Sequence, residues 1–156
     1  MASFEREIFQ SISTTMPGAF FRRIYDMRHT PNKPFDFELF HRAMFIALEA
    51  KHQKDRLDFR RLKSHQMANL ELVEDNGGYS FFLVRIEDSK LHQKKFRAFI
   101  VPFNAMKNHM EKSEKSSINA EELEELSVFE ASRYRHENGS YLWNLNEFFE
   151  AFKPEI

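Results

Sequence analysis

The feature that most constrains the fold of this chain is a largely apolar stretch at residues 34–51, PFDFELFHRAMFIALEAK. Its pattern predicts two strands, at 36–41 and 43–50. Apolar residues occupy both faces of the second strand, which is typical of a strand buried in the middle of a sheet. We therefore expect a sheet with residues 43–50 near its centre.

Asp36, Glu49 and Lys51 are ionisable residues at the ends of these two strands. In an antiparallel hairpin that turns at Arg42 and Ala43, Asp36 lies opposite Glu49, and opposed Cβ atoms are about 4.5–5.5 Å apart. Glu49 and Lys51 differ by two positions, so both point to the same face of their strand. The pattern predicts that the three groups converge, although the turn lacks the Asn or Gly that tight hairpins prefer.

The same spacing occurs a second time, at Asp75, Asp88 and Lys90. Here a turn and one extended strand separate the two acids, which places them about 25–30 Å apart at about 3.3 Å per residue. Two carboxylates that far apart cannot share an ion. With 18 Glu and 11 Lys in the chain, about one Glu-x-Lys is also expected by chance, so the spacing alone indicates nothing.

Charges at the edge of a buried strand need partners or a cation. A group of carboxylates with an amine suits a hard cation, Mg²⁺ or Mn²⁺, better than zinc. Two further polar residues point toward the same sheet: Gln66 lies on the apolar stripe of a predicted helix, and Glu5 lies next to the Ile8/Ile12 stripe of another. Taken singly, Glu5 fits a solvated first-turn acid and Gln66 fits a buried amide that bonds to backbone. Taken together, they favour a site.

Periodicity and turn signals divide the rest of the chain into alternating elements. We expect helices at 3–14, 59–74, 104–111, 119–126 and 145–152, and further strands at 19–25, 79–86, 96–101 and 141–143. Asn119 followed by Glu122 predicts a capping box at the start of one helix. The order is α-β-β-β-α-β-β followed by a helical tail, which predicts one α/β (α+β) domain over 1–156 with a central mixed sheet flanked by helices.

Composition excludes several classes of site and protein. The chain has no cysteine, which excludes disulfides, thiolate zinc sites and a cysteine nucleophile. Its seven histidines are scattered without an i,i+4 pair, which argues against a histidine-metal centre. The 18 phenylalanines predict a core built largely on aromatic packing. No apolar segment resembles a signal peptide or a membrane span, so we expect no membrane association and a cytoplasmic location.

Charge is unevenly distributed although the net charge is only −1. Residues 51–65 hold six basic and two acidic side chains, whereas residues 111–130 hold seven acidic and two basic ones. Such asymmetry allows a local basic face for nucleic acid, and it also fits two solvated segments of opposite sign.

The combination of FERE in the first helix, an acid before a short strand and LEAK at the end of the next strand resembles the PD-(D/E)xK nuclease superfamily. Within it the chain is most similar to RecU-type Holliday junction resolvases, the penicillin-binding protein-related factor A family. The shared elements are Glu49-Ala50-Lys51 before a basic loop, His65-Gln66 on the next helix, Gly77-Gly78 before the following strand, and an approximation of a Lys-Ser-Ile element at 115–118. The chain departs from that family in lacking its stalk insertion, since only about ten residues, 26–35, precede the acid. Phe35 also stands where the family commonly has a small or hydroxyl residue.

The resemblance implies a restriction-endonuclease-like fold and metal-dependent cleavage of four-way (Holliday) junction DNA by a homodimer without an organic cofactor, in a bacterial or phage-infected cell. It implies that Asp36, Glu49 and the main-chain carbonyl of Ala50 hold Mg²⁺ or Mn²⁺, with Glu5 supporting a ligand water or a second ion. Lys51 would orient and help deprotonate the attacking water, and Gln66 would position Lys51 or the water.

The basic residues on either side of the proposed site are the candidates for contact with DNA. They are Arg28 and Lys33 before it, and Lys54, Arg56, Arg60, Arg61 and Lys63 after it. Two alternatives stay open: another PD-(D/E)xK DNA endonuclease, of the repair or restriction type, and a non-catalytic junction-binding protein.

Overall fold

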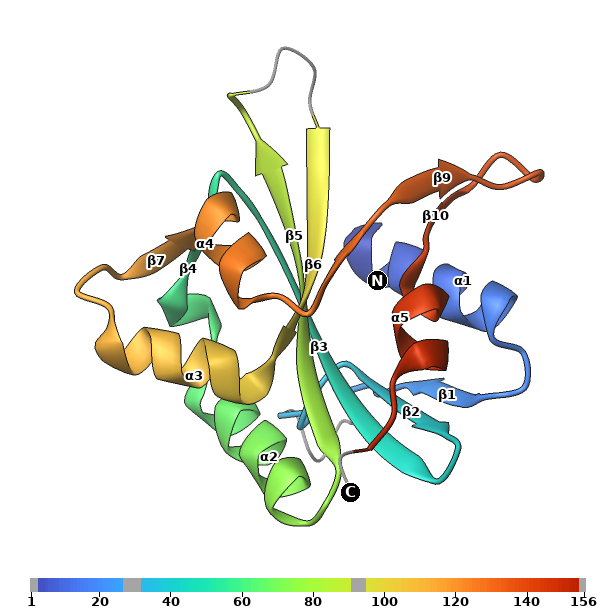
Figure 1. The fold of residues 1–156 in the computed structure, drawn as a ribbon, viewed down its shortest axis with the longest axis horizontal. Coiled ribbons are helices and arrows are strands. Elements are labelled where there is room, and N and C mark those ends of the chain that lie inside the picture. Colours follow the sequence, from blue (N-terminus) through green and yellow to red (C-terminus); the bar gives the residue numbers. More distant parts are fainter. Residues whose placement is uncertain (1–2, 27–31, 91–94, 155–156) are drawn as a thin grey trace.

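A computed structural model describes residues 3–26, 32–90 and 95–154 (Figure 1). A six-stranded sheet has the order β1-β2-β3-β5-β6-β8. Its strands are β1 (Phe20–Arg23), β2 (Phe37–His41), β3 (Met44–Lys54), β5 (Tyr79–Asp88), β6 (Lys95–Pro102) and β8 (Phe129–Ala131). The sheet is mixed, because β3 and β5 are parallel while the other neighbours are antiparallel.

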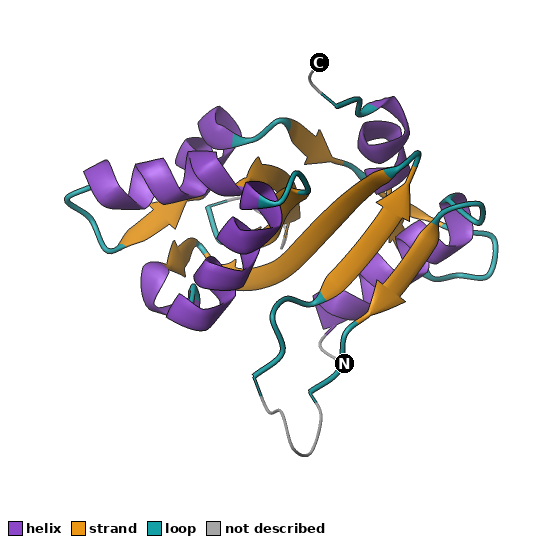
Figure 2. Ribbon diagram, turned by 90° about the horizontal axis from the view of Figure 1, so that it is seen from below, coloured by secondary structure: helices purple, strands orange, loops and turns teal. Residues whose placement is uncertain are grey.

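Helices cover both faces of this sheet (Figures 1 and 2). They are α1 (Ser3–Thr15), α2 (Ser64–Asp75), α3 (Phe103–Lys112), α4 (Ala120–Leu126) and α5 (Leu145–Ala151). In Figure 1, α2, α3 and α4 lie on one side of the sheet and α1 and α5 on the other. Two small pairs of strands complete the fold: β4 (Arg56–Asp58) with β7 (Ser117–Asn119), and β9 (Arg133–Arg135) with β10 (Tyr141–Trp143).

The alternation along β3 divides the buried side chains between two cores. Met44, Ile46 and Leu48 pack with α1 and α5, whereas Ala47 packs with α2, α3 and α4. The prediction that β3 is a central strand with two apolar faces is confirmed. Each core contains several aromatic side chains, and Phe81 of β5 makes edge contacts with Phe148, Phe149 and Phe152 of the C-terminal segment.

The β2–β3 hairpin has the register that the sequence predicts. Phe37 pairs with Leu48, and His41 pairs with Met44. The turn residues Arg42 and Ala43 have φ values of 51° and 60°, so both adopt the left-handed conformation of a type I′ turn. The hairpin therefore forms without the Asn-Gly sequence that this turn favours.

The structure differs from the prediction mainly between β3 and α2. The helix expected at 59–74 begins only at Ser64, because β4 and a 3₁₀ turn at Phe59–Arg61 occupy the preceding residues. Strands β4, β7, β8 and β9 were not predicted, and each has only three residues, too few for a period of two to be visible. The capping box at Asn119 and Glu122 is confirmed. Within the described residues, none of the helices combines the length and the apolar character that a membrane crossing requires.

Candidate active site

Backbone pairing on both sides fixes Asp36, which immediately precedes β2. Its N–H donates to the carbonyl oxygen of Leu48 at 3.1 Å, and its own carbonyl oxygen accepts from the N–H of Ile24 at 2.8 Å. The strand pairing ends at Phe37 and Leu48, and the Asp36 backbone bonds to Leu48 rather than to Glu49. The carboxylates of Asp36 and Glu49 still line one pocket and lie close enough for Asp36 to raise the pKa of Glu49, so the expected convergence of the side chains is present.

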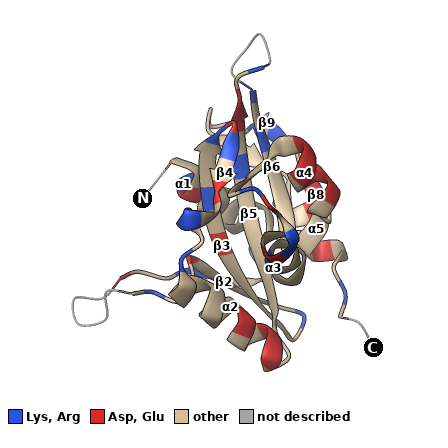
Figure 3. Cartoon of the chain, turned by 90° about the vertical axis from the view of Figure 1, so that its left-hand side faces the viewer, with Lys and Arg blue, Asp and Glu red and all other residues tan. Residues whose placement is uncertain are grey.

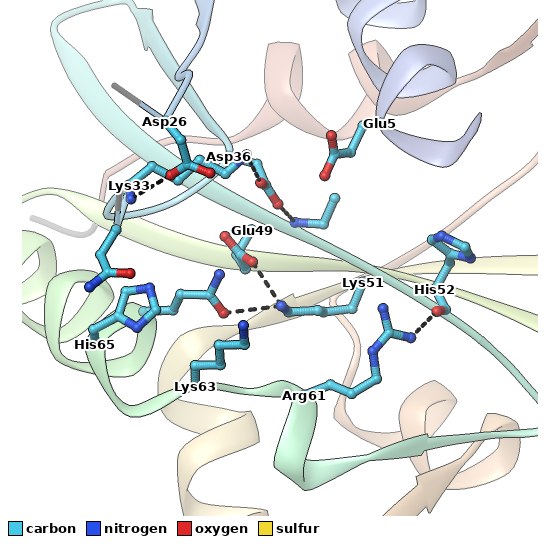
Figure 4. A pocket seen from close by; sticks show the side chains of 13 residues that line it. Glu5, Asp26, Lys33, Asp36, Glu49, Lys51, His52, Arg61, Lys63 and His65 are labelled. Carbon is cyan, nitrogen blue, oxygen red and sulfur yellow. Dashed lines mark hydrogen bonds and ion pairs between the residues drawn. The ribbon is translucent and has the colours of Figure 1, made fainter. Parts of the chain in front are cut away.

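Glu49 and Lys51 project from β3 on the face that α2 covers. The Lys51 Nζ atom lies 3.0 Å from Glu49 Oε2 and donates to Gln66 Oε1 at 3.0 Å. Gln66 belongs to α2, whose buried residues are Gln66 and Leu70. The inward direction of Gln66, expected from its place on the apolar stripe, thus brings its amide oxygen to the Lys51 ammonium (Figure 4).

Burial makes the Glu49 carboxylate costly to ionise. Its side chain is 2% exposed, and its Oε1 atom is buried without a hydrogen-bond partner in the described structure. Burial and the nearby Asp36 carboxylate raise the pKa of Glu49 to about 8, although the Lys51 ammonium opposes this shift. A second cation close to these carboxylates would relieve their mutual repulsion.

Lys33 provides a cation on the other side of Asp36. Its Nζ atom lies 2.8 Å from Asp36 Oδ1, and its backbone N–H donates to Asp26 Oδ1 at 2.9 Å. Burial alone lowers the pKa of Lys33, but the hydrogen bond and charge of Asp36, with the charges of Glu5 and Glu49, raise it overall. The remaining Asp36 oxygen, Oδ2, accepts from the N–H of Ala50 at 2.8 Å. A lysine ammonium thus lies against each of the two carboxylates, Lys33 against Asp36 and Lys51 against Glu49.

A pocket of about 290 Å³ surrounds these groups (Figure 4). Its charged lining consists of four carboxylates (Glu5, Asp26, Asp36 and Glu49), four lysine or arginine side chains (Lys33, Lys51, Arg61 and Lys63), and the imidazoles of His52 and His65. Burial and the charges of Arg85 and Arg61 lower the pKa of His52, while the charge of Glu7 opposes them. The pocket therefore combines oxygen ligands for a cation with positive groups for an anion.

The donor set at the base of the pocket fits a hard divalent cation. Asp36 and Glu49 offer carboxylate oxygens, and the buried Glu49 Oε1 has no partner among the described residues. No cluster of three or more histidine, aspartate or glutamate side chains suited to a metal occurs in the part of the chain that the structure describes. Mg²⁺ does not need such a cage, since it retains several waters and binds through one or two carboxylates.

Glu5 lines the same pocket from the first turn of α1 but already has a partner. Its Oε2 atom lies 3.3 Å from the Arg23 guanidinium of β1. Its side chain is 18% exposed, which leaves it accessible from the pocket. A role for Glu5 toward a ligand water or a second ion stays a prediction.

The seven basic residues proposed for DNA contact separate into groups. Lys33, Arg61 and Lys63 line the pocket, and the Arg61 guanidinium also donates to the His52 carbonyl oxygen. Arg56 instead donates to Ser117 and approaches Glu122, and Arg60 pairs with Asp58 at 2.7 Å. Lys54 is exposed at the end of β3, and Arg28 lies outside the described residues. Figure 3 shows lysine and arginine near β4 and acidic residues on α4 and α2.

Sequence reasoning missed part of the pocket. It assigned Lys33 to DNA and did not foresee its ion pair with Asp36, nor the places of Asp26, His52 and His65 in the lining. Lys33 stands three residues before Asp36, a spacing that carries no signal in an irregular loop. His52 follows Lys51 directly, and adjacent side chains of a strand point to opposite faces, so strand geometry gave no signal for its place in the lining.

Comparison with known proteins agrees with this geometry. A model of the family described as Recombination protein U matches residues 22–145. None of the curated proteins compared with the chain matches it. Among solved structures, Hjc from Archaeoglobus fulgidus, a Holliday junction resolvase from an archaeal hyperthermophile, has a TM-score of 0.51 and 18% identity, over 80% of this chain and 93% of that chain.

The structural likeness supports the fold class, since a central mixed sheet flanked by helices is also the architecture of this restriction-endonuclease-like neighbour. The family match spans most of the chain and contains Asp36, Glu49, Lys51 and Gln66. The chain belongs to the Recombination protein U family, a family of Holliday junction resolvases.

Proposed function

We propose that this Holliday junction resolvase hydrolyses phosphodiester bonds of four-way junction DNA with Mg²⁺ or Mn²⁺ at the Asp36–Glu49 pair, and that it acts as a homodimer. The observation that carries the proposal is the convergence of Asp36, Glu49, Lys51 and Gln66 in one pocket. Ion pairs that only stabilise a fold seldom leave a buried carboxylate oxygen without a partner.

The ligands proposed for the cation are Asp36, Glu49 and the main-chain carbonyl of Ala50, with Glu5 acting through a ligand water. When bound, a divalent cation supplies neutralisation of phosphate charge and a lowered pKa for water. A cation bound at Asp36 would balance the charge of that carboxylate in place of the Lys33 ammonium. Lys33 would then be able to pair with another anion. A phosphate of the bound DNA is the nearest candidate for that anion.

Lys51 and Gln66 act on the attacking water in this proposal. The Lys51 ammonium lies 3.0 Å from both Glu49 Oε2 and Gln66 Oε1, so two contacts restrict its position. From there it orients the water and stabilises negative charge on the phosphate oxygens. One bond forms between the water oxygen and phosphorus, one P–O ester bond breaks, and the leaving oxygen gains a proton.

Arg61 and Lys63 are the strongest candidates for holding the scissile strand beside the pocket. Both line it, and no carboxylate of the described residues is paired with either. Phosphate contacts of this kind position the DNA without reading its sequence. Symmetric resolution of a junction needs two cuts and therefore two such sites, which is the reason for proposing a homodimer.

Cleavage of a synthetic four-way junction, with and without Mg²⁺ and beside a linear duplex of the same arm sequence, tests the proposal. We expect cutting of the junction that requires the metal and is lost in Glu49→Gln. Equal cutting of the linear duplex would indicate a different DNA endonuclease. Junction binding without cleavage in Mg²⁺ or Mn²⁺ would indicate a non-catalytic binding protein.

A further inference from the structure

A second basic pocket lies on the sheet beside the β9–β10 hairpin, outside the catalytic cluster. It has a volume of about 410 Å³ and is lined by three cations, Lys95, Arg97 and Arg133, with one carboxylate, Glu130, and by the indole of Trp143. In Figure 1, the start of β6 and the strands β9 and β10, which contribute lining residues, lie in the upper part of the view. Its composition is that of a site for an anion.

The only acid in this lining is already paired. Arg97 donates to both oxygens of Glu130, at 3.0 and 2.8 Å, and also to Glu124 at 3.2 Å. Lys95 makes no ion pair with any described carboxylate, and Arg133 has only Glu7, at 3.7 Å, a carboxylate that Arg85 also contacts at 2.6 Å. The positive charge of Lys95 therefore has no counter-ion among the described residues, and that of Arg133 is only partly balanced.

Trp143 adds a hydrogen-bond donor without an acceptor. The residue is 1% exposed, and its Nε1 atom is buried with no partner in the described structure. An indole N–H can only donate, so a missing partner here must be an acceptor. Because buried donors are rarely left unpaired, this atom points independently to an anion or another acceptor at the pocket.

Aromatic rings hold the Arg133 guanidinium in place. Its central carbon lies 4.4 Å from the ring centre of Tyr141, 5.1 Å from that of Phe96 and 5.9 Å from that of Trp143. Stacking of this kind fixes the guanidinium plane without neutralising its charge. Tyr141 is 47% exposed beside it, which places an accessible ring next to the cation.

Positive groups connect this pocket to the catalytic one. His52, which lines the catalytic pocket, is the register partner of Arg85 on β5. The Arg85 guanidinium shares Glu7 with Arg133, at 2.6 and 3.7 Å. Glu7 and Glu5 both lie in the N-terminal part of α1, about 3 Å apart along its axis. The same helix end therefore supplies a lining residue of the catalytic pocket, Glu5, and an ion-pair partner of Arg133, Glu7.

We infer that the Lys95–Arg133–Trp143 pocket binds a backbone phosphate of the DNA, away from the bond that is cut. The inference rests on the proposed function. Arg133 and Lys95 supply charge, the Trp143 N–H supplies a directed hydrogen bond, and the β9–β10 hairpin lies against the DNA arm that leaves the catalytic pocket. A phosphate there anchors this arm and carries no sequence preference.

Binding of a labelled four-way junction in Ca²⁺, followed by anisotropy over a range of salt, tests the charge contribution. Lys95→Ala combined with Arg133→Gln should weaken binding several-fold and reduce the slope of log K against log salt by about one to two units. Lys112→Ala combined with Lys115→Ala removes the same charge from the acidic segment and serves as the matched control. Lys95→Ala alone should give an intermediate slope, and Arg133→Lys, which keeps the charge, should keep the slope close to that of the wild type.

The single tryptophan offers a direct readout of the same pocket. In a ¹⁵N-labelled protein the one indole N–H resonance should shift on addition of the junction and stay in place on addition of Ca²⁺ alone. A shift with inorganic phosphate but none with DNA would overturn the assignment to a DNA backbone. Unchanged salt slopes in the double variant, in a protein that still binds and cuts junctions, would also overturn it. Absence of junction cleavage by the wild type would instead refute the proposed function.

Discussion

Two parts of the chain have the same spacing of two acids and a lysine, but the fold brings only one of the two sets together. Asp36, Glu49 and Lys51 meet in one pocket. Asp75 ends α2 and Asp88 ends β5, so all of β5 that precedes Asp88, residues 79–87, lies between them. The Asp88 carboxylate accepts from the N–H of Lys90 at 3.0 Å. The difference lies in the intervening chain, because a hairpin returns on itself and a single strand does not.

Burial distinguishes the two sets as sharply as distance does. Asp36 and Glu49 are 3% and 1% exposed, whereas Asp75 and Lys90 are exposed to solvent. Desolvation raises the pKa of Glu49 and leaves one of its oxygens without a partner. Residues with this spacing thus form a candidate active site only where the fold brings their side chains together and buries them away from water.

The largest contrast should appear when the carboxylates are replaced. Asp36→Asn or Glu49→Gln should reduce junction cleavage by at least about a thousandfold, because the charge that holds the cation is lost. Asp75→Asn and Asp88→Asn, which make the same chemical change in the open copy, should cut at the wild-type rate. Single-turnover cleavage in Mg²⁺ measures this, with junction binding in Ca²⁺ as the control for folding. Substantial Mg²⁺-dependent cutting by both Asp36→Asn and Glu49→Gln would refute the site.

The two lysines provide the next contrast. Lys51→Ala should lower the cleavage rate by at least about a hundredfold, as expected for a group that positions the water and stabilises charge. Lys90→Ala should leave the rate unchanged. Mn²⁺ affinity, measured by calorimetry, should change little in Lys51→Ala and would rise if its charge opposes metal binding. A normal rate for Lys51→Ala together with a slow Lys90→Ala would mean that the wrong copy of the spacing has been chosen.

The pH dependence of stability, measured in a chelator, should change in a variant of Glu49 and stay the same in a variant of Asp88. The pKa of Glu49 is raised above its unfolded value, so its contribution to stability is present at acidic pH and is lost as the pH rises toward about 8. Between pH 5 and 9 the metal-free wild type should therefore lose on the order of 2 kcal/mol that Glu49→Gln retains. Denaturant unfolding in EDTA measures the slope, and Asp88→Asn should follow the wild type. A pH dependence shared by Glu49→Gln and the wild type would show that Glu49 is not the group responsible.

Two neighbouring arginines extend the comparison to the DNA surface. Arg61 lines the pocket that contains Asp36 and Glu49, whereas Arg60 is paired with Asp58 and does not line it. Arg61→Ala should weaken junction binding several-fold and flatten its salt dependence by about one unit, and Arg60→Ala should have a smaller effect. Anisotropy in Ca²⁺ tests both. Equal salt slopes for the two variants would mean that this basic segment is only a solvated surface.

The smallest effect concerns the turn that closes the hairpin. Arg42 and Ala43 both adopt positive φ, a conformation that Asn and Gly adopt at lower cost. Arg42→Asn with Ala43→Gly should stabilise the protein by about 0.5–1 kcal/mol and raise its Tm by a few degrees, with cleavage unchanged. Thermal unfolding measures this, and a loss of stability would show that the Arg42 side chain, which donates to the Glu150 carbonyl oxygen, contributes more than the turn costs.

The hairpin and the position of Gln66 were predictable because they follow from fixed periods. A strand places alternate residues on one face, an antiparallel pair has a constant register, and a helical stripe repeats about every 3.6 residues. The ion pair between Lys33 and Asp36 was not predictable, because it depends on the path of an irregular loop. The sequence also did not predict that only some residues of the basic segment line the pocket. Arg56 is held away by the β4–β7 pairing, in which it donates to Ser117, 61 positions further along the chain.

The most direct test of the central claim is the position of the metal itself. Crystals of the protein containing Mn²⁺ should give an anomalous difference peak between the carboxylates of Asp36 and Glu49, beside the main chain of Ala50. The peak should be lost in Glu49→Gln and retained in Asp88→Asn. A peak at Asp88, or an unoccupied Asp36–Glu49 pair in a protein that cuts junctions in the same Mn²⁺ concentration, would contradict the account.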